Sequence, residues 1–247
     1  MRMRKLLLGT SVLAGLSLAT GAQAADMPLK AQRAAPYYNW TGCYVGGHVG
    51  AAWNSGANWT NKEGTHFFTS IGQVDNFGDS NEFIGGGQVG CNYQTGQLVL
   101  GVEGTWSHVR FDDTLVRPGP FSLDTLRFRT SDITTFAGRL GWAWDRWLVY
   151  GKGGLATANV SIRASEEPFF PHFLQDTRRH HGFVAGFGVE YGWTQFIVLG
   201  LEYNFIGLNT KDHIGVDNIA FDPRYVIRVD PGDIHTVTAR ASFKFGP

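Results

Sequence analysis

Apolar residues alternate with small or polar residues in eight separate stretches of the chain. From Cys43 to Asn54, one face carries mainly cysteine, valine, alanine and tryptophan, and the other carries glycine, histidine and asparagine. Successive side chains of a strand point to opposite faces, so this period of two predicts β-strands. The eight stretches are 43–54, 83–94, 98–107, a segment that ends near 142, 148–156, 183–192, 197–205 and 234–245.

The connections between these strands alternate between short and long. Short joins fall at 95–96, 145–146 and 194–195, and long ones near 55–80, 110–125, 162–180 and 207–232. Membrane barrels have short periplasmic turns and longer external loops, and 9 to 11 tilted residues are enough to cross a bilayer. A soluble sandwich has no reason to sort its loops in this way. The pattern predicts an all-β fold, an eight-stranded antiparallel up-and-down transmembrane β-barrel.

The two faces of the predicted barrel differ in polarity. The apolar face ends in aromatic residues, which suit a lipid surface flanked by aromatic girdles. These residues are Trp53, Trp106, Trp142, Tyr191, Tyr203, Phe243 and Phe245. The other face is rich in glycine and carries acids and bases that must pair inside a narrow barrel. We expect a barrel-interior charge network made of Glu103, Arg139, Lys152, Glu190, Glu202, Arg240 and Lys244.

The strand count bears on whether the barrel conducts. Eight strands enclose an interior just wide enough for side chains, which predicts a lumen that is closed or nearly closed. Interior glycines argue for a narrow water path, because small residues leave gaps. These glycines are Gly46, Gly50, Gly86, Gly90, Gly186 and Gly188.

Composition and charge exclude several classes of protein. The chain has 33 glycines among 247 residues and only 17% charged residues, which excludes a disordered tail or a solvated helical bundle. The formal net charge is zero, and the only charges in the first 24 residues are Arg2, Arg4 and Lys5. Without that segment the chain is slightly acidic, so we expect no nucleic-acid partner.

The first 24 residues read as a secretory signal peptide. A basic start leads into an apolar run from Leu6 to Ala19, and Ala22-Gln23-Ala24 matches a small-residue cleavage site. The run has 14 residues, whereas a membrane helix needs about 20. We expect a removed signal peptide at 1–24, a short periplasmic lead-in at 25–39 and the barrel at 40–247.

Seven motifs, in order, resemble the strands of one bacterial family. They are 40–47 (WTGCYVGG), 85–90 (GGGQVG), 101–104 (GVEG), 139–142 (RLGW), 150–154 (YGKGG), 201–203 (LEY) and 243–246 (FKFG). The chain resembles the small outer-membrane β-barrel proteins of alphaproteobacteria, the immunogenic surface-protein group related to OmpA-like barrels. One departure is that Gly246 and Pro247 follow the aromatic Phe245.

The resemblance implies a location in the outer membrane of a Gram-negative bacterium and a porin-family description. The expected partners are outer-membrane lipid and, during insertion, the barrel-assembly machinery. The expected state is a monomer.

The two cysteines, Cys43 and Cys91, lie on the apolar face of the first two predicted strands. Antiparallel pairing that sets Trp53 opposite Asn81 also sets these cysteines opposite each other. The Cα atoms of such a pair lie within disulfide range, and an exported protein meets an oxidising compartment. We predict a disulfide; two free thiols that face lipid are the alternative.

Candidate chemistry is sparse. His172, His180 and His181 share the third long connection and are candidate ligands for haem iron or another metal, since some proteins of the resembling family are described as haemin-binding. No fixed ligand spacing such as H-x-x-x-H supports them, and solvated loop histidines are the alternative. At the barrel rim, His108 lies near Asp112 and Asp113 without a serine tied to them by spacing. We therefore predict no enzyme and no cofactor.

These observations favour a structural and surface-presenting role for an integral outer-membrane barrel. The strands would form the scaffold, and the four long connections would carry the variable contacts. A narrow porin for small solutes and a surface haemin- or metal-binding protein remain the alternatives.

Overall fold

The computed structural model describes residues 38–63, 71–118, 123–167, 173–215 and 225–246, and every regular element in them is a strand. The predicted signal peptide and most of the lead-in lie outside these ranges. The strands are β1 (Gly42–Asn54), β2 (Asn58–Glu63), β3 (Val74–Asn76), β4 (Ser80–Thr95), β5 (Leu98–Pro118), β6 (Leu123–Trp144), β7 (Trp147–Glu167), β8 (Phe173–Gly192), β9 (Ile197–Leu208), β10 (Lys211–Gly215), β11 (Tyr225–Asp230) and β12 (Asp233–Phe245). Among the described residues, no helix is long and apolar enough to cross a membrane.

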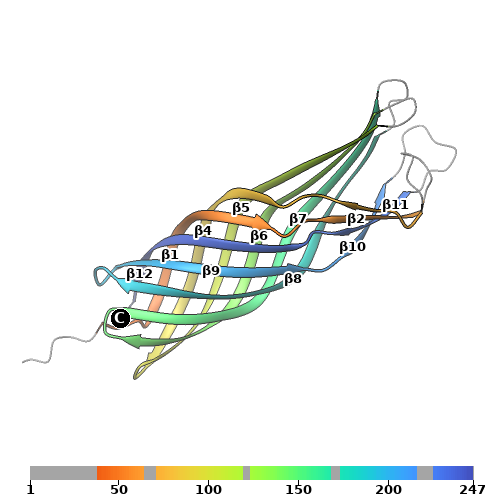
Figure 1. The fold of residues 1–247 in the computed structure, drawn as a ribbon. Helices are drawn as coiled ribbons and strands as arrows, with labels where there is room; N and C mark the ends of the chain where they lie inside the picture. Colours follow the sequence, from red (N-terminus) through yellow and green to blue (C-terminus); the bar gives the residue numbers. More distant parts are fainter. Residues whose placement is uncertain (1–37, 64–70, 119–122, 168–172, 216–224, 247) are drawn as a thin grey trace, which may run out of the picture. The chain divides into compact units, whose positions relative to one another are not determined.

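Eight of these strands close into an antiparallel barrel in the order β1-β12-β9-β8-β7-β6-β5-β4 (Figure 1). The remaining four form a second sheet in the order β10-β11-β2-β3. The predicted eight-stranded barrel is therefore confirmed. Many large apolar side chains of the barrel point outward, and Phe83 and Leu155 are both more than two thirds exposed.

The first hairpin has the predicted register. Trp53 lies opposite Asn81 and Cys43 lies opposite Cys91. The two cysteines form a disulfide at the short-turn end of the barrel, with Cα atoms 3.9 Å apart. The predicted disulfide is confirmed.

The long connections differ from the prediction, because much of them is strand. The β5–β6 and β7–β8 hairpins continue past the apolar band that ends at Trp106, Phe136, Leu155 and Phe183. We call residues 108–118, 123–134, 157–167 and 173–182 the extension. The first and last connections supply β2, β3, β10 and β11.

A bulge in β6 explains why its start could not be found from alternation. The buried positions are odd-numbered from Ile133 onward but even-numbered up to Thr130. The register shifts between Ser131 and Thr134, and Asp132 has a φ of 51°. An extra residue in a strand reverses the facing of everything beyond it, which breaks a period-two pattern.

Three hydrophobic clusters lie inside the structure. The first, at the short-turn end, contains Tyr38, Trp40 and Leu148, and the second fills the barrel near its other end around Phe111, Ile133 and Ile234. The third joins the extension to the second sheet and comprises Ala57, Trp59, Phe77, Leu126, Phe128, Val160, Ile162, Ala164, Ile227 and Val229, with Leu115 against it. We call these the lower, middle and upper clusters.

Candidate functional site: a filled lumen

Six of the seven predicted interior charges form one network across the barrel. Glu103 lies at its centre, where its carboxylate accepts hydrogen bonds from Lys152 Nζ at 3.0 Å, from Arg139 Nη1 at 3.4 Å and from Arg240. These side chains come from the neighbouring strands β5, β6 and β7 and from β12, which lies on the opposite side of the barrel. All of them are nearly inaccessible to solvent.

The other two carboxylates complete the network. Lys152 Nζ donates to Glu202 at 2.7 Å, Arg139 Nη2 donates to Glu190 at 2.8 Å, and Arg240 also pairs with Glu202. Three acids thus face three bases, so the buried charges balance. Such mutual pairing offsets the cost of removing each charge from water.

The seventh predicted member, Lys244, lies apart from this network. Its Nζ donates to the carbonyl of Asn39 and lies 4.9 Å from the centre of the Tyr38 ring. Lys244 therefore holds the last residues of the lead-in at the short-turn end of the barrel. Tyr38 and Trp40 are almost fully buried there.

The network also contains two tyrosines, which sequence reasoning did not single out. Tyr44 Oη donates to Glu103 at 2.7 Å, and Tyr150 Oη donates to Glu202 at 2.6 Å. The Arg139 guanidinium also stacks 3.8 Å from the centre of the Tyr150 ring. The signal available in the sequence was that both tyrosines lie on the glycine-rich face of their strands, opposite the lipid face.

The expectation that interior glycines leave gaps is wrong for the positions beside these tyrosines. The Tyr150 hydroxyl covers Gly188, where an added Cβ would lie 2.6 Å from Tyr150 Oη. Tyr44 covers Gly90 in the same way. The glycines make room for the aromatic rings, and the rings fill the lumen.

Two cavities beside the network are small. One cavity of about 20 Å³ lies beside His48, Thr105 and Asn204, and another of about 10 Å³ lies between Trp40 and Glu190. A single water needs about 10 to 15 Å³, so each cavity has room for about one water. The lower and middle clusters close the network off on both sides.

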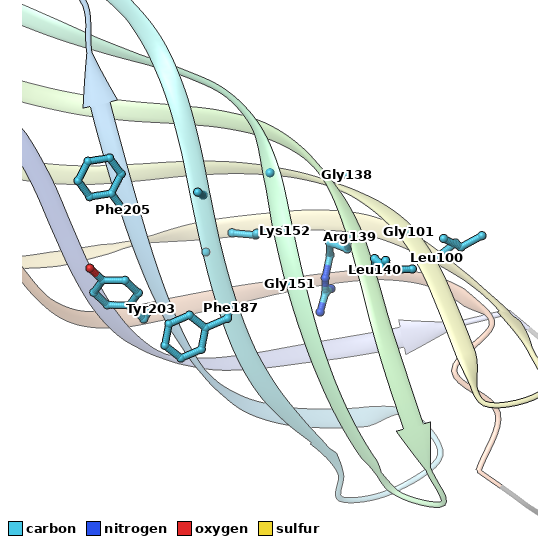
Figure 2. Close-up of a pocket in the computed structure, with 13 residues that line it drawn as sticks. Leu100, Gly101, Gly138, Arg139, Leu140, Gly151, Lys152, Phe187, Tyr203 and Phe205 are labelled. Atoms are coloured by element: carbon cyan, nitrogen blue, oxygen red, sulfur yellow. The ribbon is translucent and has the colours of Figure 1, made fainter.

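A hollow of about 1050 Å³ lies on the outer side of the barrel (Figure 2). Its floor is made of small residues such as Gly138, Gly151 and Ala185, and Phe187 and Leu140, 63% and 55% exposed, are part of its lining. Because these residues belong to the outward apolar face, we expect membrane hydrocarbon to cover this groove.

The candidate histidine ligands are separated by the structure. His181 is exposed, whereas its neighbour His180 is fully buried, and His172 lies outside the described residues. His180 Nε2 lies 3.0 Å from Nε2 of His213, which is also fully buried. His180 Nδ1 contacts the Asn209 carbonyl at 2.8 Å, and His213 Nδ1 lies 3.2 Å from Asp176 Oδ2. His180 is therefore not a solvated loop histidine but part of the contact between β8 and β10.

The described residues contain no group of three or more histidine, cysteine, aspartate or glutamate side chains that could hold a metal. Sequence reasoning missed the His180–His213 pair because the two residues are 33 positions apart and belong to different sheets.

This pair predicts a pH dependence. Burial lowers the pKa of His213 to about 4 and also lowers the pKa of His180 from 6.5. The unfolded chain then binds more protons than the folded one, so stability is full above pH 6.5 and falls as the pH drops toward about 4. We expect His213→Gln to weaken this loss, measured as the difference in urea midpoint between pH 7 and pH 5. An identical pH dependence in the variant would contradict this assignment.

The rim residues do not assemble into a catalytic arrangement. His108 Nδ1 pairs with Asp132 at 3.0 Å, not with Asp112 or Asp113. Asp112 instead binds Arg127 and Arg129, and Asp113 accepts a hydrogen bond from Ser80 at 3.4 Å.

A closed eight-stranded barrel with an apolar exterior, a filled polar interior and short turns at one end defines an integral outer-membrane protein. The family model for the outer membrane protein beta-barrel domain matches residues 10–245, and the chain belongs to this family.

Named relatives agree with this assignment. The 31 kDa outer-membrane immunogenic protein of Brucella melitensis is 28% identical over 92% of this chain and 95% of its own length. The 22 kDa outer membrane protein of Rhizobium leguminosarum is 26% identical over 77% of this chain and 74% of its own length. The predicted resemblance and the outer-membrane location are confirmed.

Solved structures show the same fold at low identity. The outer membrane protein OprG of Pseudomonas aeruginosa is 12% identical with a TM-score of 0.51, over 85% of this chain and 98% of its own. The outer membrane protease OmpT of Escherichia coli is 7% identical with a TM-score of 0.52, over 86% of this chain and 99% of its own.

Proposed function

We propose that this protein is a sealed, monomeric outer-membrane barrel whose role is structural and surface-presenting. The observation that carries the proposal is the filled lumen, in which a balanced charge network lies between two hydrophobic clusters. The continuous apolar exterior suits outer-membrane lipid as the surrounding partner. Insertion by the barrel-assembly machinery is part of the same proposal.

The part presented outside the membrane is a packed β-structure. Phe128 from β6 and Phe77, which precedes β4, have ring centres 5.7 Å apart, and Phe77 stacks on Trp59 from β2 at 6.1 Å. The upper cluster thereby ties the extension to the second sheet. A rigid scaffold that holds a separate external structure is what a surface-presenting role requires.

The alternatives have less support. A porin needs a continuous water path, and Phe111, Ile133 and Ile234 lie across the lumen with almost no exposed surface. A haemin site through His180 needs an accessible imidazole, whereas that side chain is buried against His213.

The test is planar-bilayer conductance of the refolded protein, after an unheated gel shift has shown that the barrel is folded. We expect no discrete conductance steps, because the lumen has no room for a hydrated ion. A general porin reconstituted in the same bilayer is the positive control. Ohmic steps that vanish when the sample is heated would contradict the proposal and favour the porin.

A further inference from the structure

The outward face of the extension carries an unusual concentration of positive charge. Its described outward positions include five arginines on four neighbouring strands, against the acids Asp112 and Asp132. These arginines are Arg110, Arg127, Arg129, Arg163 and Arg179. Asp132 is already paired with His108. The whole chain has a formal net charge of zero, so the positive charge is concentrated on this face.

A hollow of about 130 Å³ lies at the centre of this face. It is lined by Arg127, Arg129, Ser161, Arg163 and Gln175, all of which can donate hydrogen bonds and none of which is an acid. These residues come from adjacent strands, since Arg129 lies opposite Ser161 and Arg163 opposite Gln175. The hollow therefore has the donor set of an anion site.

One side of the hollow is held in place by Asp112. Arg127 donates to both of its carboxylate oxygens through Nε and Nη2, at 2.6 and 2.5 Å, and Arg129 Nη2 donates to Oδ2 at 2.6 Å. The hydrogen bonds from Arg127 hold the pKa of Asp112 at about 2, so the carboxylate stays charged. The two guanidiniums are thus fixed before a ligand arrives, which reduces the entropy lost on binding.

The opposite side of the hollow repels the first. Arg163 lies directly opposite Arg127 in the β6–β7 ladder, and like charges in this position are destabilising. Among the residues whose side chains the structure describes, no carboxylate forms an ion pair with Arg163. Among those side chains nothing compensates the repulsion that Arg163 adds, and a bound anion would relieve it.

The position of the hollow limits the kind of anion. Arg163 is eight residues beyond Leu155, where the apolar band of β7 ends, or about 25 Å along the strand. This distance lies beyond the hydrocarbon and at the level of sugars attached to the outer leaflet. We propose that Arg127, Arg129 and Arg163 form a binding site for a phosphate group carried by a glycan. The glycan is either part of an outer-leaflet glycolipid or free in the medium.

Calorimetry tests the proposal with full-length protein in phosphatidylcholine nanodiscs. The probe is the deacylated, phosphorylated oligosaccharide of a rough-type lipopolysaccharide, and the same oligosaccharide after removal of its phosphates is the ligand control. A second arm uses native mass spectrometry to detect intact lipopolysaccharide on the protein in detergent. Binding of the free oligosaccharide indicates that the glycan suffices, and binding of the intact lipid alone indicates a membrane-anchored source.

We expect Arg163→Gln to weaken binding at least tenfold in whichever arm shows it, because the variant loses its charge-assisted hydrogen bonds to the phosphate. The same variant should keep or raise the thermal stability, because it removes the repulsion from Arg127. If Arg163 had a merely structural role, its replacement would lower the thermal stability. Arg127→Gln should also weaken binding.

The matched control is Arg228→Gln. Arg228 is 48% exposed and binds Asp212 through Nε and Nη2, as Arg127, 47% exposed, binds Asp112. It lies in the second sheet, away from the hollow, and its replacement should leave binding unchanged. Three results would each overturn the site: no binding in either arm, equal binding of the dephosphorylated probe, or equal losses in Arg163→Gln and Arg228→Gln.

Discussion

Glu103→Gln is expected to lower the free energy of unfolding of the barrel by about 3–5 kcal/mol, the usual effect of breaking a buried ion pair. Glu103 contacts Lys152, Arg139 and Arg240 together. Glutamine keeps the shape but removes the charge, so the interior is left with three bases and two acids. One positive charge is then left unbalanced far from water.

The measurement is the urea midpoint of unfolding in detergent micelles, followed by the shift on an unheated gel. Glu82→Gln, at an exposed position, is the control and should change stability by less than about 0.5 kcal/mol. A second substitution, Lys152→Met, restores the balance of charge and should recover part of the loss in the Glu103→Gln background. If Glu103→Gln unfolds at the same urea concentration as the wild type, the network does not stabilise the barrel.

Phe128→Ala is expected to destabilise the external part of the protein by about 3–5 kcal/mol while leaving the membrane barrel folded. Phe128 has no exposed surface and lies in the upper cluster between the extension and the second sheet. Removal of its ring leaves a cavity in the upper cluster, between the two sheets. The loss should therefore appear as local unfolding.

Hydrogen exchange of β10 and β11 measures this effect, because both strands should exchange faster in the variant. The gel shift of the unheated protein should stay unchanged. Val116→Ala, at an exposed position of the same extension, is the control. Equal protection of the second sheet in Phe128→Ala and the wild type would show that the upper cluster does not hold it.

The barrel itself was predictable because the membrane imposes a simple rule on each strand. A strand between lipid and a narrow interior must alternate, so eight alternating stretches and their turn lengths were enough to derive the fold. The alternation placed Cys43 and Cys91 on the same face, and the pairing of Trp53 with Asn81 then set them opposite each other. Six of the seven predicted interior charges meet in one network for the same reason.

Outside the membrane this rule no longer applies, and prediction failed there. The outward face of the extension meets water and carries residues such as Arg110 and Asp112, which resemble a loop. The bulge at Asp132 then reversed the alternation in β6. Contacts between distant segments, such as His180 with His213, leave no local pattern in the sequence.

The extension also determines how an antibody can recognise this protein. In β7, and in β6 up to its bulge, every second described side chain of the extension is buried, so the accessible residues are two positions apart along one strand and next to residues of its neighbours. An epitope on this face is therefore assembled from several strands. A linear peptide copied from one strand presents side chains that the folded protein hides, and antisera raised against such peptides should bind the denatured chain better than intact cells.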